Sequence, residues 1–557
     1  MELTDKSHDQ PLKFGLLLNN FTVEAWQFDA IGHLLDSGHL LSVAIIQTVS
    51  ANPQSFFSRI RQYPWRRFIF RWWHRFIFKP EAKKIVDISD LLEDIPILTV
   101  TPIQKGYSQF FPDETIQQLG EMHLDFMLRF GFSILRGDIL QSARFGIWSY
   151  HHDDERHIRG GPPGFWEVFK AHISNGVILQ QLTNDLDKGI ILARMQLPVI
   201  PYSWKAQLNQ LYFSSSYLVA QVAYKAQTAQ LFPQPSTSDA PVYKAPTNHI
   251  MCWYWIKMAW RRLLFHLRTL ILQEDWNIGL IEASLPAVTD NPKQYIPQAR
   301  WLPKKKRYQY LADPFLIEHA NETWLFAEKF DYRIGQGKIV AAKASEQYRF
   351  FRPALDVESH CSFPFVFIEG GRLFCIPENY VSDMIHIYEW DQQSEQFIFH
   401  CQILEGIAAI DPVLYTHNGI WWLLFSRKEL ASAQLYAYFS TEMKGPYKPH
   451  PLNPVKTDIF SSRNAGTPWV KNGRIYRFAQ DCAGSYGRMV RMMDMNISSN
   501  SFNETEVTRI MPDDKSPYCR GLHTINGCSQ LTVIDGKRYS FSWWGLRHQW
   551  LLKVKKR

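Results

Sequence analysis

The chain has 557 residues, of which 46% are hydrophobic and 20% charged, and its formal net charge is +8 at pH 7. This composition excludes a disordered or collagen-like protein. A chain of this length is expected to form two or three domains, because single hydrophobic cores stop growing at about 250–300 residues. Aromatic residues make up 15% of the chain, which suits a β-rich core and also surfaces that stack on carbohydrate.

The cysteines and the first residues predict a cytoplasmic protein. Seven Cys without a C-x-x-C pair are typical of a reducing compartment and predict no metal site. Residues 1–11 are polar and lack the apolar core of a signal peptide. No run reaches the ~18 uninterrupted apolar residues of a membrane-spanning helix. Basic clusters at 59–79 and 304–307 favour an anionic partner, such as phosphate groups, nucleic acid or a lipid surface.

The first part of the chain has the pattern of a βαβ unit. KFGLLLNN (13–20) predicts a buried strand, residues 22–38 predict a helix that Gly38 ends, and LLSVAIIQTV (40–49) predicts the next strand. We therefore expect a parallel sheet with right-handed crossovers. No G-x-G-x-x-G follows the first strand, which argues against a dinucleotide cofactor.

Residues 56–80 interrupt this pattern with Trp, Phe and Arg at nearly helical spacing. One interpretation is an amphipathic helix that packs on the domain. The other is a peripheral contact with the inner membrane surface or with a polyanion, because Trp and Arg together suit a headgroup interface. The sequence leaves both open.

The stretch of the chain that is richest in catalytic residue types follows two apolar segments, LDFMLRFGF (124–132) and FGIW (145–148). It is the stretch SYHHDDERHIRGGPPGFW (149–166), which is read together with DLDKG (185–189). We expect its histidines where the chain leaves the carboxyl edge of the sheet, which is where open α/β sheets bind ligands.

The spacing within this region resembles the N-x-H-x-S-L-L-P-x-Y-R-G-x-x-P-x-x-W signature of the 10-formyltetrahydrofolate-dependent formyltransferases, which include methionyl-tRNA formyltransferase and the amino-sugar N-formyltransferases. The matching positions are Ser149, His151, Arg159, Gly160, Pro163 and Trp166. The D-x-G element of the family is similar to Asp187-Lys188-Gly189. The resemblance covers residues 12–200. The departure that matters for catalysis is Ser149, which stands where the family has a catalytic Asn, and Arg136 stands where the family has the Pro of an I-L-P turn.

Formyl transfer requires an amine to be deprotonated and a tetrahedral oxyanion to be stabilised. The resemblance implies that His151 and Asp187 handle the proton and that Ser149 donates a hydrogen bond to the oxyanion. It also implies 10-formyltetrahydrofolate as the cofactor and an amino sugar as the substrate. The implied cofactor contacts are Phe130, Gly131, Ile134, Leu135 and Arg136, and the implied substrate contacts are Arg159 and Trp166.

A linker and a basic amphipathic segment follow. The catalytic domain is expected to end with a helix near 203–230. Residues 233–248 are rich in Pro, Ser and Thr and predict a linker or exposed loop. MCWYWIKMAWRRLLFHLRTLIL (251–272) predicts a helix that is either clamped between domains or placed on a membrane surface.

From about residue 274 a unit repeats: a polar start that usually ends in Pro, an apolar strand, a turn and a second apolar strand. The copies lie at 310–328, 361–378, 409–426, 465–481 and 522–544. Pro314, Pro364, Pro412 and Pro468 are separated by 50, 48 and 56 residues, which suits four-stranded propeller blades. Five copies predict a five-bladed β-propeller, with WNIGLIEA (276–283) completing the first blade.

The motifs ADPF, SFPFVF, IPE, DPVL, HPLNPV, RNAG and AQDCAGSYG, in this order, resemble the propeller of the glucosamine inositolphosphorylceramide transferases and of arabinanase-like glycosidases. In a propeller the strand starts point at the central channel, so we expect a group of polar side chains there that binds substrate. Its members are Asp313, Asp411 and His523, with Glu328, Glu378, Arg463 and Asp481 nearby. Paired carboxylates are what glycoside hydrolysis requires, but an Asp-Pro step can also simply cap a turn.

These observations predict a multidomain α/β and all-β protein. Residues 12–230 form a formyltransferase-like catalytic domain, 231–273 a linker with a connecting helix, and 274–550 a five-bladed propeller. The predicted function is transfer of a formyl group to the amino group of a sugar. The alternatives are a catalytically weakened formyltransferase fold joined to a glycan-binding propeller, or a propeller glycosidase or glycosyltransferase accessory. No nucleic-acid partner is expected, because the small β-barrel of the tRNA enzymes is missing, and no feature specifies an oligomeric state.

Overall fold

The computed structural model describes residues 10–48, 64–185, 189–236, 238–303 and 306–555. The chain divides into two compact units, an N-terminal unit of residues 1–262 and a C-terminal unit of residues 263–557. Each unit is described by itself below.

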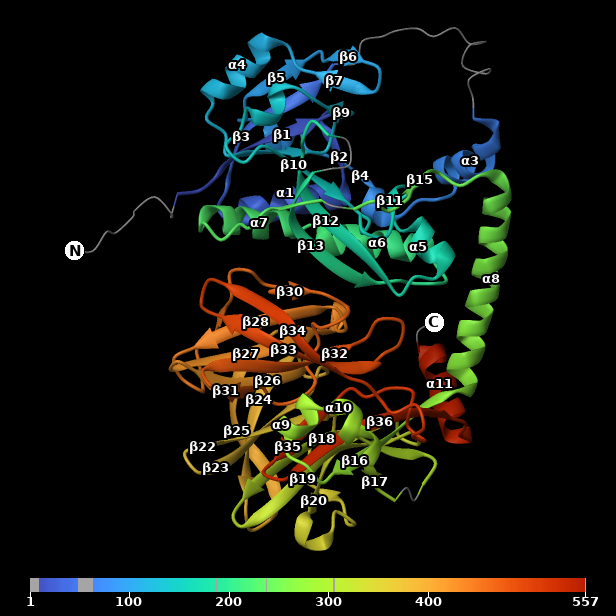
Figure 1. Ribbon diagram of the computed structural model, residues 1–557, viewed down its shortest axis with the longest axis vertical. Helices are drawn as coiled ribbons and strands as arrows, with labels where there is room; N and C mark the ends of the chain where they lie inside the picture. The colour runs from blue at the N-terminus through green and yellow to red at the C-terminus, as the bar shows by residue number, and fades with distance from the viewer. Residues whose placement is uncertain (1–9, 49–63, 186–188, 237, 304–305, 556–557) are drawn as a thin grey trace, which may run out of the picture. The chain divides into compact units, whose positions relative to one another are not determined.

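The N-terminal unit is built on one eight-stranded sheet (Figure 1). In spatial order its strands are β14 (Gln234–Pro235), β13 (Ile190–Pro198), β12 (Ser174–Gln181), β10 (Ile147–His151), β8 (Phe126–Arg129), β1 (Lys13–Leu18), β3 (Leu40–Gln47) and β5 (Ile97–Val100). The pairs from β10 to β5 are parallel, whereas β12, β13 and β14 pair antiparallel. The predicted parallel sheet is therefore present as the five strands β10, β8, β1, β3 and β5 of a mixed sheet.

Helices and short paired strands complete this unit. The helices are α1 (Ala25–Asp36), α3 (Phe68–Phe76), α4 (Asp113–Glu121), α5 (Phe165–Lys170), α6 (Trp204–Ser215) and α7 (Leu218–Gln227). The short strands are β2 (Thr22–Glu24) with β4 (Ile85–Asp87), β6 (Ile103–Lys105) with β7 (Ser108–Phe110) and β9 (Ile134–Leu135), and β11 (Arg159–Gly160) with β15 (Val242–Tyr243).

Both faces of the central strands are buried, which explains their continuous apolar sequences. On one face, Leu17, Val43 and Met127 pack with Leu119 of α4. On the other face, Phe126 stacks between Phe14 and Trp148.

Three predicted elements differ from the structure. The helix predicted at 22–38 begins only at Ala25, because residues 22–24 pair with β4 and Glu24 forms a capping box with Gln27. The helix predicted near 203–230 is two helices, α6 and α7. The linker predicted at 233–248 contributes edge strands, since β14 and β15 pair with the folded unit and Pro is tolerated at edges.

Helix α3 lies within the segment for which the sequence left two roles open, packing on the domain and contact with a surface. Its two faces correspond to these two roles. Phe70 is buried against Phe165 and Trp204, so one face packs on the domain. Trp72 and Phe76 are 47% and 62% exposed on the other face. Residues 56–63 of the predicted segment lie outside the described residues.

The boundary between the units falls within α8 (Asn248–Ile271), the helix predicted at 251–272. Its buried residues, Met251, Tyr254 and Met258, belong to the N-terminal unit. Among the helices in the described part of the chain, none combines the length and the apolar character needed to cross a bilayer.

The C-terminal unit holds five sheets of four strands each, one of which carries an additional strand. The first sheet is β18 (Gln309–His319), β19 (Glu322–Asp331), β20 (Gln336–Lys343) and β21 (Arg352–Pro353). The second is β22 (Ser362–Glu369), β23 (Arg372–Glu378), β24 (Met384–Asp391) and β25 (Gln396–Glu405). The third is β26 (Ala409–His417), β27 (Ile420–Arg427), β28 (Gln434–Ser440) and β29 (Lys448–Pro449), with β30 (Lys456–Thr457) added to β28. The fourth is β31 (Trp469–Lys471), β32 (Arg474–Asp481), β33 (Met489–Ile497) and β34 (Phe502–Ile510).

The fifth sheet joins the two ends of the unit. It consists of β17 (Arg300–Trp301), β16 (Gln273–Ile281), β36 (Leu531–Ser540) and β35 (Ile525–Cys528), and the short helices are α9 (Leu285–Asp290), α10 (Pro292–Tyr295) and α11 (Trp543–Lys555). Strand β16 pairs with β36 over nine residues. The expectation that residues 276–283 complete the first blade is therefore wrong, because they complete the last sheet.

The first strands of the sheets follow one another around a ring. Strand β18 neighbours both β22 and β35, and β22 neighbours β26. The side-chain amide of Asn464 donates to the Asp411 carbonyl in β26 at 2.8 Å, and the Ile525 amide donates to the Ala465 carbonyl at 2.9 Å, which links the fourth sheet to the third and fifth. We call this arrangement the five-sheet ring.

Three Pro residues of the repeat mark the same local geometry. The residues that precede Pro314, Pro364 and Pro412 are Asp313, Phe363 and Asp411, and their φ angles are +50°, +44° and +46°. In each sheet the strand register shifts at this point. Non-glycine residues seldom adopt this conformation. It places one side chain per sheet in an equivalent position at the start of its first strand.

Candidate functional site

The first candidate site lies where β8 and β10 end, at the edge of the N-terminal sheet. A cavity of about 320 Å³ opens there between the sheet and α1. Ser149, His151 and Arg129 line it, together with Phe130 and Gly131 from the predicted cofactor contacts. A Cβ on Gly131 would lie 2.4 Å from the Leu18 carbonyl carbon, so only glycine fits this close approach.

Ser149, which takes the place of the family Asn, is 1% exposed and bonded to an arginine. The Nε and Nη2 atoms of Arg129 donate to Ser149 Oγ at 3.2 and 2.9 Å. With Oγ accepting both bonds, the hydroxyl keeps its own O–H as a donor. Arg129 interrupts the apolar strand LDFMLRFGF, and that interruption was a signal in the sequence that could have identified it.

His151 is the last residue of β10 and lines the cavity, with its Nδ1 atom 3.9 Å from Asp153 Oδ1. Its neighbour His152 is a core residue, because it lies against Trp26 and Tyr212 and its Nε2 pairs with Ser215 Oγ at 3.2 Å. Burial holds the pKa of His152 well below its usual value, which keeps the ring neutral. The predicted partner Asp187 lies outside the described residues.

A second cavity of about 270 Å³ adjoins the first, and Arg129 and His151 line both. The remaining predicted cofactor contacts, Ile134, Leu135 and Arg136, line this second cavity. The five residues that the resemblance implies as cofactor contacts therefore line two adjacent cavities, and their cofactor role stays a prediction.

The two predicted substrate contacts of this unit lie elsewhere. Arg159 Nε donates to the Ala240 carbonyl at 2.7 Å, and Trp166 Nε1 is shared between the Gly161 and Lys244 carbonyls at 3.3 Å. Neither lines a cavity described above. Both hold the 240–244 segment against the domain, so the structure favours a packing role for them over substrate binding.

The second candidate site lies in the C-terminal unit and collects charged side chains from the sheets of the ring. Printed contacts bring these side chains together: the Asp411 main-chain N–H donates to Glu378 Oε2 at 3.1 Å, and Arg463 pairs with both carboxylates. Asp313 Oδ1 lies 3.7 Å from His523 Nε2. Burial, and then the charges of Asp313, Glu378 and Asp411, raise the pKa of Glu328. These carboxyl groups are all buried. Of the residues predicted here, the structure brings together Asp313, Glu328, Glu378, Asp411, Arg463 and His523.

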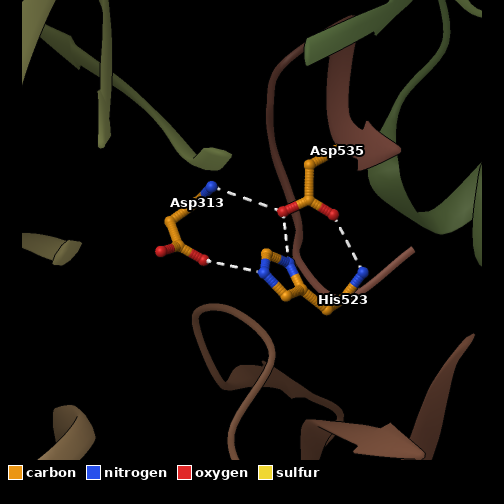
Figure 2. A group of neighbouring side chains, drawn as sticks. All are labelled: Asp313, His523 and Asp535. Carbon is orange, nitrogen blue, oxygen red and sulfur yellow. Dashed lines mark hydrogen bonds and ion pairs between the residues drawn. The ribbon is translucent and has the colours of Figure 1, made fainter. Parts of the chain in front are cut away.

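His523 lies between two aspartates (Figure 2). Its Nδ1 atom pairs closely with Asp535, and its Nε2 atom lies 3.7 Å from Asp313 Oδ1. Trp276 stacks on the imidazole with ring centroids 3.9 Å apart. Burial opposes a charge on this ring, but Asp535 and Asp313 outweigh it and raise the pKa of His523, which favours the imidazolium.

One ligand atom from each of Asp313, His523 and Asp535 lies within 4.8 Å of the others, a spacing that could admit a metal ion. The donors already have protein partners, however. Asp535 accepts the main-chain N–H groups of His523 and Thr524 at 2.8 and 3.0 Å, and both nitrogens of the imidazole face carboxylates. The imidazolium supplies the positive charge that a metal would bring. The absence of a metal site therefore stays a prediction.

Arg463 is the second cation of this site. Its Nε atom donates to Asp411 Oδ2 at 2.5 Å, and its Nη2 atom lies 3.8 Å from Glu378 Oε2. Gln480 Nε2 also donates to Asp411 Oδ2, at 2.8 Å. The Arg463 side chain is only 13% exposed, so its charge acts in surroundings that screen it weakly.

Burial and neighbouring charges raise the pKa of several of these carboxyls. Burial, then the charge of Asp313, raises the pKa of Glu328 well above its usual value. Burial, then the charge of Asp411, does the same for Glu378, although Arg463 opposes the shift. Burial raises the pKa of Asp313 to about 6 despite the nearby His523. Burial therefore favours the protonated form of Glu328, Glu378 and Asp313.

Asp481, the remaining predicted residue, belongs to a different cluster. It accepts from Arg488 Nη2 at 2.7 Å and from Arg491 Nη2 at 2.6 Å, and the Ala483 amide caps it at 3.0 Å. These bonds fix the end of β32, so the structure assigns Asp481 to packing.

Sequence reasoning missed Asp535, Trp276 and Tyr486 in the second site. The Tyr486 ring lies 4.9 Å from the Arg463 guanidinium carbon, and its centroid lies 5.3 Å from that of the His523 ring. Asp535 could have been found, because it is a charge within the apolar segment TVIDG, as Arg129 is in its own strand. Trp276 could not have been found in the same way, since it reaches the His523 imidazole only through the pairing of β16 with β36.

Sequence comparison relates part of the C-terminal unit to known proteins. A family described as "Glucosamine inositolphosphorylceramide transferase 1, N-terminal" matches residues 299–540. The protein of that name from Arabidopsis thaliana is 30% identical over 233 residues, which are 40% of this chain and 30% of the relative. The chain spans about a third of the length of the curated relatives it matches.

Two solved structures are similar to separate parts of the chain. A thermostable family-43 glycoside hydrolase covers 36% of this chain and 76% of its own, with 16% identity and a TM-score of 0.29. A sugar N-formyltransferase from Shewanella covers 42% of this chain and 76% of its own, with 11% identity and a TM-score of 0.26. Both TM-scores are below 0.5, so neither likeness defines a fold.

Proposed function

We propose that this chain is a carbohydrate-active protein whose five-sheet ring is a five-bladed propeller that binds a sugar at its centre and serves in sugar transfer. The observation that carries this proposal is the convergence of Asp313, Glu328, Glu378 and Asp411 with Arg463, inside the segment that matches relatives named as transferases.

The chemistry of sugar transfer suits this set of groups. Departure of a group from the anomeric carbon requires a proton donor, and attack by a hydroxyl requires a proton acceptor. Burial raises the pKa of Glu378 well above its usual value, which favours its protonated form, and Glu378 is the proposed donor. Asp313 is ionised above about pH 6 and is the proposed acceptor. Arg463 and the His523 imidazolium offset the negative charge.

The relatives' name suggests the substrate class. A glucosamine donor and an inositol phospholipid acceptor are the substrates we propose for this chain, since the match at 299–540 covers every strand of the ring except β16.

The test uses the full chain and two matched substitutions. Asp313→Asn removes one charge at the centre of the ring, and Asp391→Asn makes the same change at an exposed turn where Ser394 bonds the carboxylate. We expect Asp313→Asn to abolish glucosamine transfer to a phosphoinositol lipid, and Asp391→Asn to leave it intact. Transfer at the wild-type rate by Asp313→Asn would contradict the proposal.

A second candidate function, formyl transfer with 10-formyltetrahydrofolate, rests on the N-terminal cavity. There Ser149 keeps a hydroxyl donor while Arg129 bonds its oxygen, and His151 lies two residues along the same strand. Serine and guanidinium together would replace the amide of the family Asn as the group that faces the oxyanion. Calorimetry of the full chain with 5-formyltetrahydrofolate tests this candidate, and the absence of heat at millimolar ligand would remove it.

We also propose a peripheral contact of α3 with an anionic membrane surface from the cytoplasmic side. Trp65, Trp72 and Phe76 are exposed, and Arg75 lies 5.8 Å from the Phe76 ring, a combination suited to lipid headgroups. Phe76→Ser should weaken sedimentation with phosphatidylserine vesicles, whereas the same change at the exposed Phe232 of this unit should not. Equal sedimentation of both variants would refute the contact.

A further inference from the structure

We infer that the 270 Å³ cavity of the N-terminal unit is an anion-binding site, in which Arg129 and Arg136 hold the carboxylate or phosphate group of a small organic ligand. This inference is independent of the sugar site proposed for the ring. It follows from two arginines that line one cavity and bond only to neutral acceptors among the described residues.

Among the described residues, Arg129 is held in place by neutral acceptors alone. Its Nε and Nη2 atoms donate to Ser149 Oγ, and its Nη1 atom donates to the Ser133 carbonyl at 3.0 Å. None of its bonds within the described chain goes to a carboxylate. Burial lowers the pKa of Arg129, but a guanidinium stays charged in a protein. Arg129 is half-buried, and a charge that is partly withdrawn from water is costly unless it is paired. An anionic ligand in this cavity would supply that partner.

Arg136 repeats this arrangement across the same cavity. Its Nε atom donates to Ser108 Oγ at 3.0 Å and its Nη1 atom donates to the Asn184 carbonyl, so described loops on both sides orient its guanidinium. The replacement of a family Pro by Arg136 therefore places a second cation here. His151 lines the cavity as well, and Asp185 is the one carboxylate among the lining residues that the structure describes.

The other walls define the rest of the ligand. Ile134, Leu135 and Leu182 give the cavity an apolar side opposite its cations. Arginine binds carboxylate and phosphate groups through paired N–H donors. The ligand is therefore a compact, largely apolar molecule that carries an anionic group. A neutral ring alone would leave the charges of Arg129 and Arg136 without a partner.

The test is calorimetry of the full chain at low ionic strength with acetate, inorganic phosphate and acetamide. Acetamide matches acetate in shape but carries no charge. We expect acetate or phosphate to bind and acetamide not to bind, and the better of the two anions identifies the ligand group. Arg129→Gln should weaken anion binding by about tenfold or more, since charge-assisted bonds are about twice as strong as neutral ones.

Matched variants control for charge and for folding. Arg144→Gln removes an exposed arginine of this unit that pairs with Asp125 at 3.6 Å, and it should leave anion binding unchanged. Arg129→Lys keeps the charge and should retain part of the affinity. If Arg129→Gln does not fold, Arg136→Gln carries the same expectation. Binding of acetamide as strong as that of acetate, or unchanged anion affinity in the folded glutamine variants, overturns the inference.

Discussion

Arg463 is the position at which the structure makes the sharpest stability prediction. Its guanidinium pairs with Asp411 at 2.5 Å and lies 3.8 Å from Glu378, in a site where Glu328 and Asp313 are also buried. Arg463→Met removes the cation and keeps much of the side-chain volume. The four carboxyl groups then remain close together without the cation that offsets their negative charge.

The magnitude follows from breaking a buried ion pair on one side. Such a change typically costs about 3–5 kcal/mol, because the remaining charge stays buried without its partner. For a unit of this size, about 2–4 °C of melting temperature corresponds to 1 kcal/mol, so we expect Tm to fall by roughly 6–20 °C. Scanning calorimetry of the full chain measures this shift.

The loss should also depend on pH. The folded-state pKa of Glu378 is already raised, and Arg463 is the group that opposes the rise. A raised folded pKa contributes stability below the unfolded pKa of about 4 and loses it as pH rises through the folded value. Removing Arg463 raises that value further, so the variant should lose more stability at pH 8 than at pH 5.

The control is Arg372→Met in the same unit, where an exposed arginine pairs with Glu389 at 3.0 Å. Exposed pairs contribute about 0–1 kcal/mol, so its Tm should change by only a few degrees. If Arg463→Met were no more destabilising than Arg372→Met, or equally destabilising at both pH values, the account of a charge-coupled centre would be wrong.

Further predictions concern single positions. Glu328→Gln removes a carboxyl whose raised pKa disfavours folding at high pH, so its stability relative to wild type should increase from pH 5 to pH 8 in denaturant titrations. Gly337→Ala should destabilise the ring by about 1–3 kcal/mol in the same assay, because its Cβ would lie 2.1 Å from Glu328 Oε1. Gly32→Ala should instead stabilise α1 by about 0.5–1 kcal/mol, since a Cβ there meets nothing within 4 Å. His151→Ala should abolish folate release if the N-terminal unit transfers formyl groups, and Ser149→Asn should preserve it; wild-type turnover in His151→Ala would refute the assignment.

The sequence by itself determined the local elements and the chemistry they carry. Unbroken apolar runs predicted the buried strands β1 and β3, because both faces of a central parallel strand are covered. The regular spacing of Pro314, Pro364 and Pro412 predicted repeating sheets, and the acidic residues beside two of these prolines marked the centre of the C-terminal unit. These signals are local, since each depends on residues close together in the chain.

The tertiary structure alone decided which distant residues meet. Ser149 and Arg129 are 20 residues apart and bond because β10 lies beside β8 in the sheet order. Trp276 reaches His523 only because β16 pairs with β36, more than 250 residues later. Strand order and register depend on long-range pairing, in which a shift of one residue would turn every side chain to the other face. Whether Arg129 has a charged partner, and whether Asp481 faces the ring centre or Arg491, depended on that pairing and not on residue type.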